Sequence, residues 1–292
     1  MQPIRINLRG TGICVGIAFV FLFLFIKLIF SHSYSSNSSL QSNSSLLVYE
    51  QFQSNFTRTE RPLHWSEREI EEIPQDLKVG NDYSTIGIRE SSLLVEGASE
   101  PIYLRESLDE SKAESIEGSV LLLHGSEYSS HTWLELGTLH QLAKLGYRAV
   151  AIDLPGYVNS KNAALQGDPS TFLANLIERL NLGRPVIISP SMSGDYALPL
   201  VMKRPDLVRG FVPVAPTSTS NFTDEQYAEN KTPTMIVYGE LDTQLGDTSY
   251  EHLKHMPDIQ LHKIHKANHA AYIDFTDRFH QLLYNFLKNV PK

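Results

Sequence analysis

Residues 186–194 read VIISPSMSG, an apolar run that predicts a buried strand and ends in three serines spaced two residues apart, before a helical pattern begins. The central serine, Ser191, has the small residues Ser189 and Ser193 two positions away on either side. A nucleophilic serine on a sharp turn between a strand and a helix needs small residues there, because strand and helix pack closely at the turn. The segment therefore predicts a nucleophile elbow with Ser191 as the nucleophile. A buried strand followed by an ordinary polar turn is the alternative.

Two residues further along the chain are suited to activate such a serine. An elbow serine needs a general base that takes its proton and an acid that orients the base, and the acid precedes the base along the chain. Asp242 follows a strand-like run at 234–238, and His269 follows another at 259–264 and lies among small residues. We therefore predict a triad of Ser191, Asp242 and His269.

Other acids and histidines lie near these positions. Glu240 and Asp247 remain alternative acids, because spacing does not determine the place of the acid on the loop after its strand. His262 and His265 lie on or near a predicted strand, and together with His269 they suggest a metal site. Because neither a cysteine nor a His-Glu-x-x-His helix accompanies them, we expect no metal.

The run 119–124 predicts a second buried strand, which ends in His124 and Gly125. In enzymes with a nucleophile elbow, the loop after such a strand supplies one N–H group of the oxyanion hole, and glycine lets the backbone approach the substrate oxygen. We expect the backbone N–H groups of Ser126 and Met192 to form the hole. His124 precedes the serine in the chain, and we expect it to hold the loop in place.

Strand-like runs alternate with helical segments along most of the chain. The predicted strands cover residues 92–96, 101–105, 119–124, 148–153, 185–190, 210–215, 234–238 and 259–264. From the third strand onward helical segments separate them, such as 132–145 and 170–180. This alternation predicts an α/β fold, with a mostly parallel sheet and helices on both faces.

Six segments carry a specific resemblance. They read LLLHG (121–125), SHTWLELGTLHQLAKLGYRAVAIDLPG (130–156), SPSMSG (189–194), GFVPVAPTSTSNFT (210–223), PTMIVYGELD (233–242) and ANHAAY (267–272). In this order, over about residues 90–290, they closely resemble the alpha/beta-hydrolase domain-containing protein 14 family. The resemblance implies an alpha/beta-hydrolase fold, and a Ser-x-Ser-x-Ser elbow whose nucleophile, acid and base match Ser191, Asp242 and His269.

The resemblance also implies a class of reaction. The family is similar to small serine esterases, and its soluble branch removes acyl groups from lysine with coenzyme A as acceptor. We therefore expect a serine hydrolase that works through an acyl-enzyme, needs no cofactor, and passes the acyl group to water or to coenzyme A. A binding module that kept the fold without catalysis is the alternative.

One connection between predicted strands is short. Many α/β-hydrolases insert a lid between the strands that correspond to 210–215 and 234–238, but here only residues 216–233 join them. The sequence therefore predicts a minimal lid, an open site, and a small ester, thioester or acyl-amide substrate.

The N-terminus contains an apolar stretch, residues 13–30, interrupted by Lys27. At about 1.5 Å per residue this helix is about 27 Å long, which is close to the thickness of the hydrocarbon core of a bilayer. Arg5 and Arg9 precede it, whereas residues 31–57 contain no Lys or Arg. This charge bias predicts a cytosolic N-terminus and type II topology. A cleaved signal peptide is the alternative, and with an anchor the chain resembles the membrane-anchored branch of the family.

The predicted organisation follows from this anchor. We expect a cytosolic tail (1–10), a transmembrane signal anchor (11–30), a flexible stalk (31–59), an irregular lead-in (60–90) and a hydrolase domain (91–292) on the lumenal or extracellular side. Five Asn-x-Ser/Thr triplets are glycosylation candidates on that side: Asn37, Asn43, Asn55, Asn221 and Asn230.

Composition limits the remaining partners. The formal net charge of −8 disfavours nucleic acid, because neutralising phosphates requires a basic surface. The single cysteine, Cys14, lies in the predicted span, so the domain needs no disulfide. We expect a monomer that meets the membrane through residues 11–30.

Overall fold

The computed structural model describes residues 63–78 and 86–292. The predicted tail, anchor and stalk lie outside the described residues. Within the described part of the chain, no helix combines the length and the apolar character needed to cross a bilayer.

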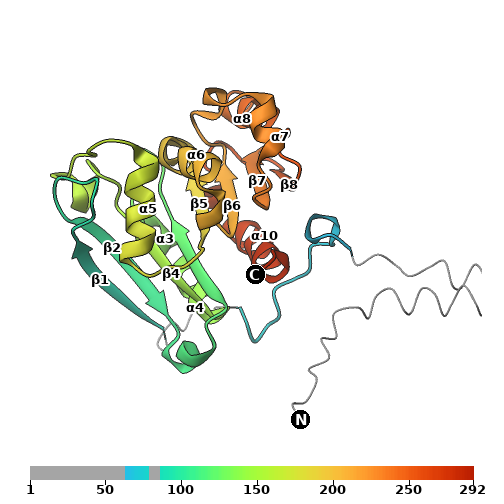
Figure 1. The fold of residues 1–292 in the computed structure, drawn as a ribbon. Coiled ribbons are helices and arrows are strands. Elements are labelled where there is room, and N and C mark those ends of the chain that lie inside the picture. Colours follow the sequence, from blue (N-terminus) through green and yellow to red (C-terminus); the bar gives the residue numbers. More distant parts are fainter. Residues whose placement is uncertain (1–62, 79–85) are drawn as a thin grey trace, which may run out of the picture. The chain divides into compact units, whose positions relative to one another are not determined.

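An eight-stranded sheet forms the centre of the described domain, in the order β1-β2-β4-β3-β5-β6-β7-β8 (Figure 1). Its strands are β1 (Gly87–Leu93), β2 (Ile102–Leu108), β3 (Gly118–Leu122), β4 (Tyr147–Ile152), β5 (Val186–Pro190), β6 (Gly210–Val214), β7 (Thr234–Gly239) and β8 (Ile259–Ile264). Only the pairs β1–β2 and β2–β4 are antiparallel, and all other pairs are parallel. The mostly parallel sheet predicted from the sequence is therefore confirmed.

The central strands are buried on both sides. Every residue of β5, β6 and β7 is buried, which explains why these strands are continuous apolar runs in the sequence. β1 is different, because it is an edge strand with an exposed, polar sequence. The prediction of strands at 92–96 and 101–105 was therefore wrong in its boundaries, and β1 already begins at Gly87, inside the segment predicted as an irregular lead-in.

Helices cover both faces of the sheet (Figure 1). They are α3 (Ser130–Glu135), α4 (Thr138–Lys144), α5 (Pro169–Arg179), α6 (Gly194–Lys203), α7 (Asp224–Glu229), α8 (Leu245–Leu253), α9 (Ala271–Asp274) and α10 (Thr276–Asn289). Buried side chains of α5, α6 and α8 form one apolar core with one face of the sheet. Those of α3, α4 and α10 form a second core on the other face.

The predicted helix at 132–145 is two helices in the structure. Gly137 separates α3 from α4 with a φ of +70°, a left-handed conformation that glycine adopts without steric cost. The prediction of a helix at 170–180 is confirmed to within one residue at each end.

Short 3₁₀ helices complete the secondary structure of residues 63–78 and 86–292. They are η1 (Trp65–Glu67), η2 (Glu110–Ser115), η3 (Val158–Ser160), η4 (Ser191–Ser193), η5 (Pro205–Leu207) and η6 (Thr219–Asn221). η1 attaches the start of the domain to its end, because Trp65 is buried and its ring packs edge-on against Phe286, with 5.1 Å between the ring centroids. The loops that follow β3, β5, β7 and β8 lie at the carboxyl edge of the sheet, where open α/β folds bind ligands.

Candidate active site

Ser191 lies where β5 turns into η4 and α6, and its φ of +49° is in the left-handed region. A residue with a side chain holds this conformation only when its surroundings enforce it. Ser189 and Ser193, the small residues that predicted the elbow, are fully buried with their Oγ atoms 3.1 Å apart. Ser193 Oγ also donates a hydrogen bond to the carbonyl of Pro190 (2.8 Å). The serines that replace the usual glycines therefore tie the turn together.

One imidazole connects the three residues predicted as a triad. His269 Nε2 lies 2.8 Å from Ser191 Oγ, and its Nδ1 lies 2.6 Å from Asp242 Oδ2. With the hydroxyl of Ser191 donating to Nε2 and Nδ1–H donating to the carboxylate, the ring has the tautomer that a general base requires. The Asp242 side chain is 7% exposed and that of His269 is 43% exposed. The acid is therefore shielded from water, while the base lies at an open surface.

Gly239 brings the loops of the acid and the base together. An added Cβ at this position would lie 2.0 Å from the carbonyl oxygen of Asn268 and 2.4 Å from that of Ala267. The two loops are also joined by a hydrogen bond from Leu241 N–H to the Ala267 carbonyl (2.9 Å). This close approach depends on a residue without a side chain.

The alternative acids have other partners. Glu240 pairs with His265 (2.6 Å), whose side chain is 73% exposed, and Asp247 pairs with Lys263 (3.0 Å). The pKa of Glu240 is lowered mainly by a hydrogen bond from a backbone N–H, and that of Asp247 mainly by its hydrogen bond with Lys263. Both carboxylates are thus surface groups that bind neighbours other than His269.

The three histidines that suggested a metal site have separate environments. His269 bonds Asp242 and Ser191, and His265 faces Glu240 at the surface. His262 is mostly enclosed, its Nε2 has no hydrogen-bond partner, and burial lowers its pKa to about 4. Across the described residues no set of three or more His, Cys, Asp or Glu side chains is placed to bind a metal.

The loop after β3 lies directly against the elbow. A Cβ added to Gly125 would lie 3.5 Å from the Cβ of Ser191. His124 is fully buried; its Nε2 accepts a hydrogen bond from Leu154 N–H (3.0 Å), and its Nδ1–H donates to the Gly125 carbonyl (2.8 Å). Burial lowers the pKa of His124, which keeps the ring neutral, as this pairing requires.

His124 also orients the first predicted oxyanion donor. A trans peptide is planar, so the carbonyl of Gly125 and the N–H of Ser126 point in opposite directions. Holding that carbonyl against His124 therefore fixes the direction of the Ser126 N–H. Met192 is the second residue of η4, and a helix offers no internal acceptor to an N–H in its first turn.

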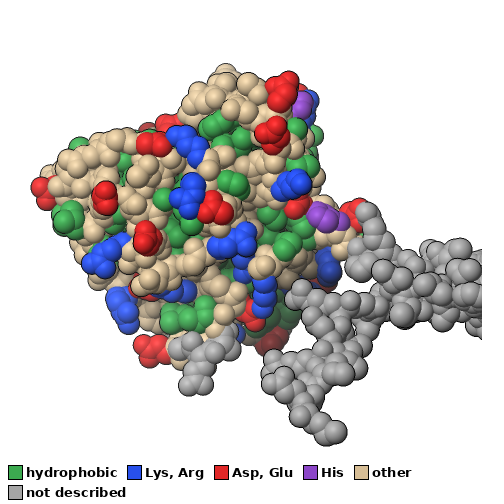
Figure 2. Space-filling view, in the orientation of Figure 1, with side chains coloured by type: hydrophobic (Ala, Val, Ile, Leu, Met, Phe, Trp, Pro, Cys, Tyr) green, Lys and Arg blue, Asp and Glu red, His purple; other side chains and the backbone are tan. Residues whose placement is uncertain are grey.

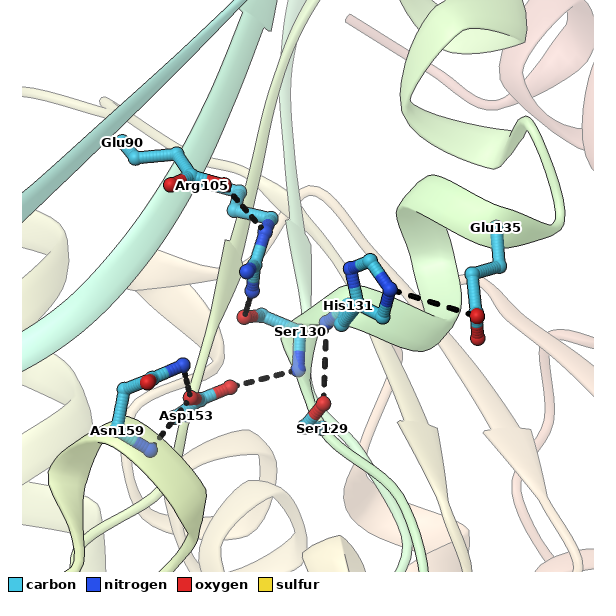
Figure 3. Close-up of polar contacts among 8 residues, drawn as sticks. All are labelled: Glu90, Arg105, Ser129, Ser130, His131, Glu135, Asp153 and Asn159. Carbon is cyan, nitrogen blue, oxygen red and sulfur yellow. Dashed lines mark hydrogen bonds and ion pairs between the residues drawn. The ribbon is translucent and has the colours of Figure 1, made fainter.

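A polar network centred on the buried Asp153 anchors the end of the same loop (Figure 3). Asp153 is fully buried and accepts hydrogen bonds from Ser130 N–H (2.7 Å) and from two nitrogens of Asn159 (3.0 and 2.9 Å). Arg105 donates to Ser130 Oγ (2.5 Å) and to Glu90 (3.0 Å). Asp153 thus joins the start of α3 to the segment that follows β4.

The predicted glycosylation positions differ in accessibility. Asn37, Asn43 and Asn55 lie outside the described residues. Asn221 is exposed. Asn230 is only 6% exposed, and its Nδ2, the atom to which a glycan would attach, donates to the Val201 carbonyl (2.8 Å). In the folded domain the side-chain amide of Asn230 is therefore inaccessible and acts as a structural hydrogen-bonding group, and its glycosylation stays a prediction.

Two cavities of about 460 and 490 Å³ lie away from the triad. The first is lined mainly by polar residues of the lead-in, α4 and α10, and the second by β8 and the start of α10. Neither of these two is lined by a triad residue, and the site is identified by its hydrogen-bonding geometry. On the face drawn in Figure 2, acidic and basic side chains are interspersed.

Comparison with known proteins identifies the family and the fold. A family model described as "alpha/beta hydrolase fold" matches residues 118–231. Human "Protein ABHD14A" is 45% identical over 194 residues, which are 65% of this chain and 71% of that protein. Human "Putative protein-lysine deacylase ABHD14B" is 45% identical over 207 residues, 69% of this chain and 96% of that protein.

Solved structures show the same fold at lower identity. A protein from Thermoplasma acidophilum described as a "predicted CIB-like hydrolase" superposes with a TM-score of 0.62 at 22% identity, covering 70% of this chain and 99% of that one. The two human relatives are equally similar in sequence, so identity does not separate the two branches of the family. The fold, the family model and these relatives together show that the chain belongs to the ABHD14 family of α/β hydrolases.

Proposed function

We propose that this chain is a serine hydrolase that cleaves small acyl esters, thioesters or acyl amides through a covalent acyl-enzyme. The observation that supports this most strongly is the position of His269, whose two ring nitrogens lie within hydrogen-bond distance of Ser191 Oγ (2.8 Å) and Asp242 Oδ2 (2.6 Å). Surface serines and histidines do not need such an arrangement, whereas an activated serine does.

The proposed reaction has two halves. First, Ser191 Oγ bonds to the acyl carbon while His269 Nε2 takes its proton, and the N–H groups of Ser126 and Met192 stabilise the negative oxygen. His269 then gives that proton to the leaving oxygen, sulfur or nitrogen as its bond to the acyl carbon breaks. In the second half, an acceptor loses a proton to His269 and attacks the acyl-enzyme, and Ser191 recovers its hydroxyl proton. Asp242 stays ionised throughout.

The surroundings of the triad favour small substrates. The connection between β6 and β7 contains only two short helices, η6 and α7, and the side chain of His269 remains 43% exposed. Such a site lacks the large apolar lid that encloses a long acyl chain. We expect higher activity on acetyl and butyryl esters than on long-chain triglycerides, and the reverse order would contradict the proposal.

Deacylation of lysine is the second candidate within this chemistry. It is favoured by 45% identity to human "Putative protein-lysine deacylase ABHD14B" over 96% of that protein. An acyl-lysine is a secondary amide, so the same triad and the same acyl-enzyme apply. Incubation with an acyl-lysine peptide and coenzyme A distinguishes the acceptors, because a coenzyme A acceptor yields an acyl thioester whereas water yields the free acid.

Membrane attachment is a separate proposal that rests on the sequence alone. The apolar stretch at 13–30 and the positive charges before it support a type II anchor over residues 11–30, with the hydrolase domain on the lumenal or extracellular side. A monomer attached to the membrane by this segment would reach its small substrates without a protein or nucleic-acid partner.

Labelling with a fluorophosphonate probe tests the proposed function. The full-length chain in mild detergent should label, and Ser191→Ala and His269→Ala should abolish labelling. His265→Ala and Ser220→Ala are matched controls, because both residues are exposed and lie outside the triad, and they should label as the unmodified chain does. A folded chain that never labels would favour the alternative, a binding module on a hydrolase fold.

A further inference from the structure

Asp195 lies in the first turn of α6, four residues after Ser191, and is exposed. One of its oxygens, Oδ1, accepts hydrogen bonds from Thr217 Oγ1 (2.6 Å) and from Ser218 Oγ (2.5 Å). Both hydroxyls belong to the segment 215–218, which follows β6. The carboxylate therefore joins the helix that starts at the nucleophile to a loop on the neighbouring strand.

The same segment holds the backbone of the nucleophile. Thr217 N–H donates to the carbonyl of Ser191 (2.9 Å). The two segments are also in close van der Waals contact, because a Cβ added to Gly194 would lie 2.5 Å from the Thr217 carbonyl oxygen and 2.9 Å from Pro216 Cβ. A shift of Thr217 would therefore be transmitted to Ser191 directly.

Three of the six non-glycine residues with a positive φ in the described part of the chain lie at this contact. Ser191, Ala215 and Ser218 have φ angles of +49°, +44° and +62°, all in the left-handed region. Non-glycine residues stay in this region only when surrounding interactions hold them there. The hydrogen bonds from Thr217 and Ser218 to Asp195 are such interactions, because they fix the segment that contains Ala215 and Ser218 against the helix that follows Ser191.

We propose that Asp195 is a positioning residue for the nucleophile, an inference that rests on the proposed function. Its carboxylate holds segment 215–218 against the elbow, and Thr217 N–H in turn holds the Ser191 carbonyl. This arrangement keeps Ser191 Oγ in line with His269 Nε2. Asp195 acts through Thr217 and Ser218 and does not touch the substrate.

Steady-state kinetics of the full-length chain on an acetyl ester test this role. Asp195→Ala removes both hydrogen bonds of the link, and Thr217→Val removes the one from Thr217. Asp195→Ala should lower kcat by about 10²-fold and Thr217→Val by a smaller factor, both with little change in KM, because small displacements of a reacting group cost about that much. Asp195→Asn should keep most of the activity, since its amide oxygen still accepts both hydrogen bonds. Asp206→Ala is the control, because Asp206 is an exposed carboxylate paired with Arg204 (2.7 Å), and it should leave kcat unchanged.

The variants separate positioning from other roles of a carboxylate. If the charge itself mattered, through the helix dipole or the substrate, Asp195→Asn would be as impaired as Asp195→Ala and Thr217→Val would be active, which would overturn the proposal. Normal kcat in both Asp195→Ala and Thr217→Val would also overturn it. Unfolding of Asp195→Ala would leave Thr217→Val to decide, because that change preserves the volume of the side chain and the charge of the helix. If the unmodified chain neither reacts with the fluorophosphonate probe nor turns over the ester, the proposed function fails and the positioning role fails with it. If the unmodified chain reacts with the probe and both Asp195→Ala and Thr217→Val keep a normal kcat, only the positioning role is rejected.

Discussion

Ser191 Oγ lies 2.8 Å from His269 Nε2, although 78 residues separate them in the sequence. The contact forms because β5 and β8 are parallel members of one sheet, so the elbow and the loop after β8 emerge at the same edge. β6 and β7 lie between them, which leaves the loop after β7 to deliver Asp242 to the other side of the ring.

Turnover should distinguish the proposed acid from its nearest rival. Asp242→Asn should lower kcat by about 10⁴-fold, because His269 would lose the partner that selects its tautomer. Glu240→Gln is the matched control and should retain activity, since Glu240 pairs with His265 at the surface. Kinetics on an acetyl ester checks both, and a larger loss in Glu240→Gln would assign the acid to Glu240.

His124 should affect turnover without affecting binding. His124→Ala removes one of the two donors to the Gly125 carbonyl and leaves Tyr128 N–H (3.0 Å) as the other. The direction of the Ser126 N–H is then less firmly held, and kcat should fall by up to about 10²-fold, the cost of one lost oxyanion donor. KM should change little. A rise in KM with an unchanged kcat would contradict this, and would indicate that the loop binds substrate but does not stabilise the oxyanion.

Gly239→Ala should damage both stability and the triad. The new Cβ would lie 2.0 Å from the Asn268 carbonyl oxygen, and such overpacking costs about 1–3 kcal/mol or more. Gly87→Ala is the control, because nothing lies within 4 Å of a Cβ added there. Urea unfolding should show the loss for Gly239→Ala only, and equal stability of the two variants would mean that the loops can separate without cost.

The free energy of unfolding of the domain should decrease as the pH falls below neutral. Burial lowers the pKa of His262 and His280 from 6.5 to about 4. Because the unfolded chain takes up protons at about 6.5 and the folded chain does not, their contribution is complete above about pH 6.5 and is lost as the pH falls towards 4, by up to about 3 kcal/mol per histidine. Urea unfolding at pH 7 and pH 5 checks this. His262→Gln should flatten the dependence, and an unchanged slope in that variant would contradict the assignment for His262.

Glycosylation should separate Asn221 from Asn230 and test the topology. With the triplets of Asn37, Asn43 and Asn55 removed, the chain expressed in mammalian cells should carry one glycan, which Asn221→Gln abolishes and Asn230→Gln does not, because Asn230 Nδ2 is bound to Val201. Mobility before and after glycosidase treatment measures this. Absence of any glycan on the original five-triplet chain would argue against a lumenal or extracellular domain.

Local sequence was informative where a local requirement governs the structure. Ser189 and Ser193 predicted the elbow because a sharp turn between strand and helix excludes large residues. The apolar runs predicted β5, β6 and β7 because strands inside a parallel sheet are buried on both faces. β1 was misplaced for the opposite reason, since its exposed edge leaves no apolar pattern to read.

Other features depend on contacts between distant segments. Spacing alone left Asp242, Glu240 and Asp247 as competing acids, and the choice depends on how Gly239 brings the loop after β7 against the loop after β8. The burial of Asn230 likewise appears only when α6 packs beside it.

The sequence alone therefore predicted the α/β class, the elbow, and the residue types and order of the proposed triad, because each follows from rules that act over a few residues. Only the tertiary structure decided three contacts: the pairing of Asp242 with His269, the anchoring of the oxyanion loop by Asp153, and the link from Asp195 to Thr217. A hydrogen bond requires two groups to meet within about 3 Å, and the sheet order that brings them there leaves no trace in the residues around either partner.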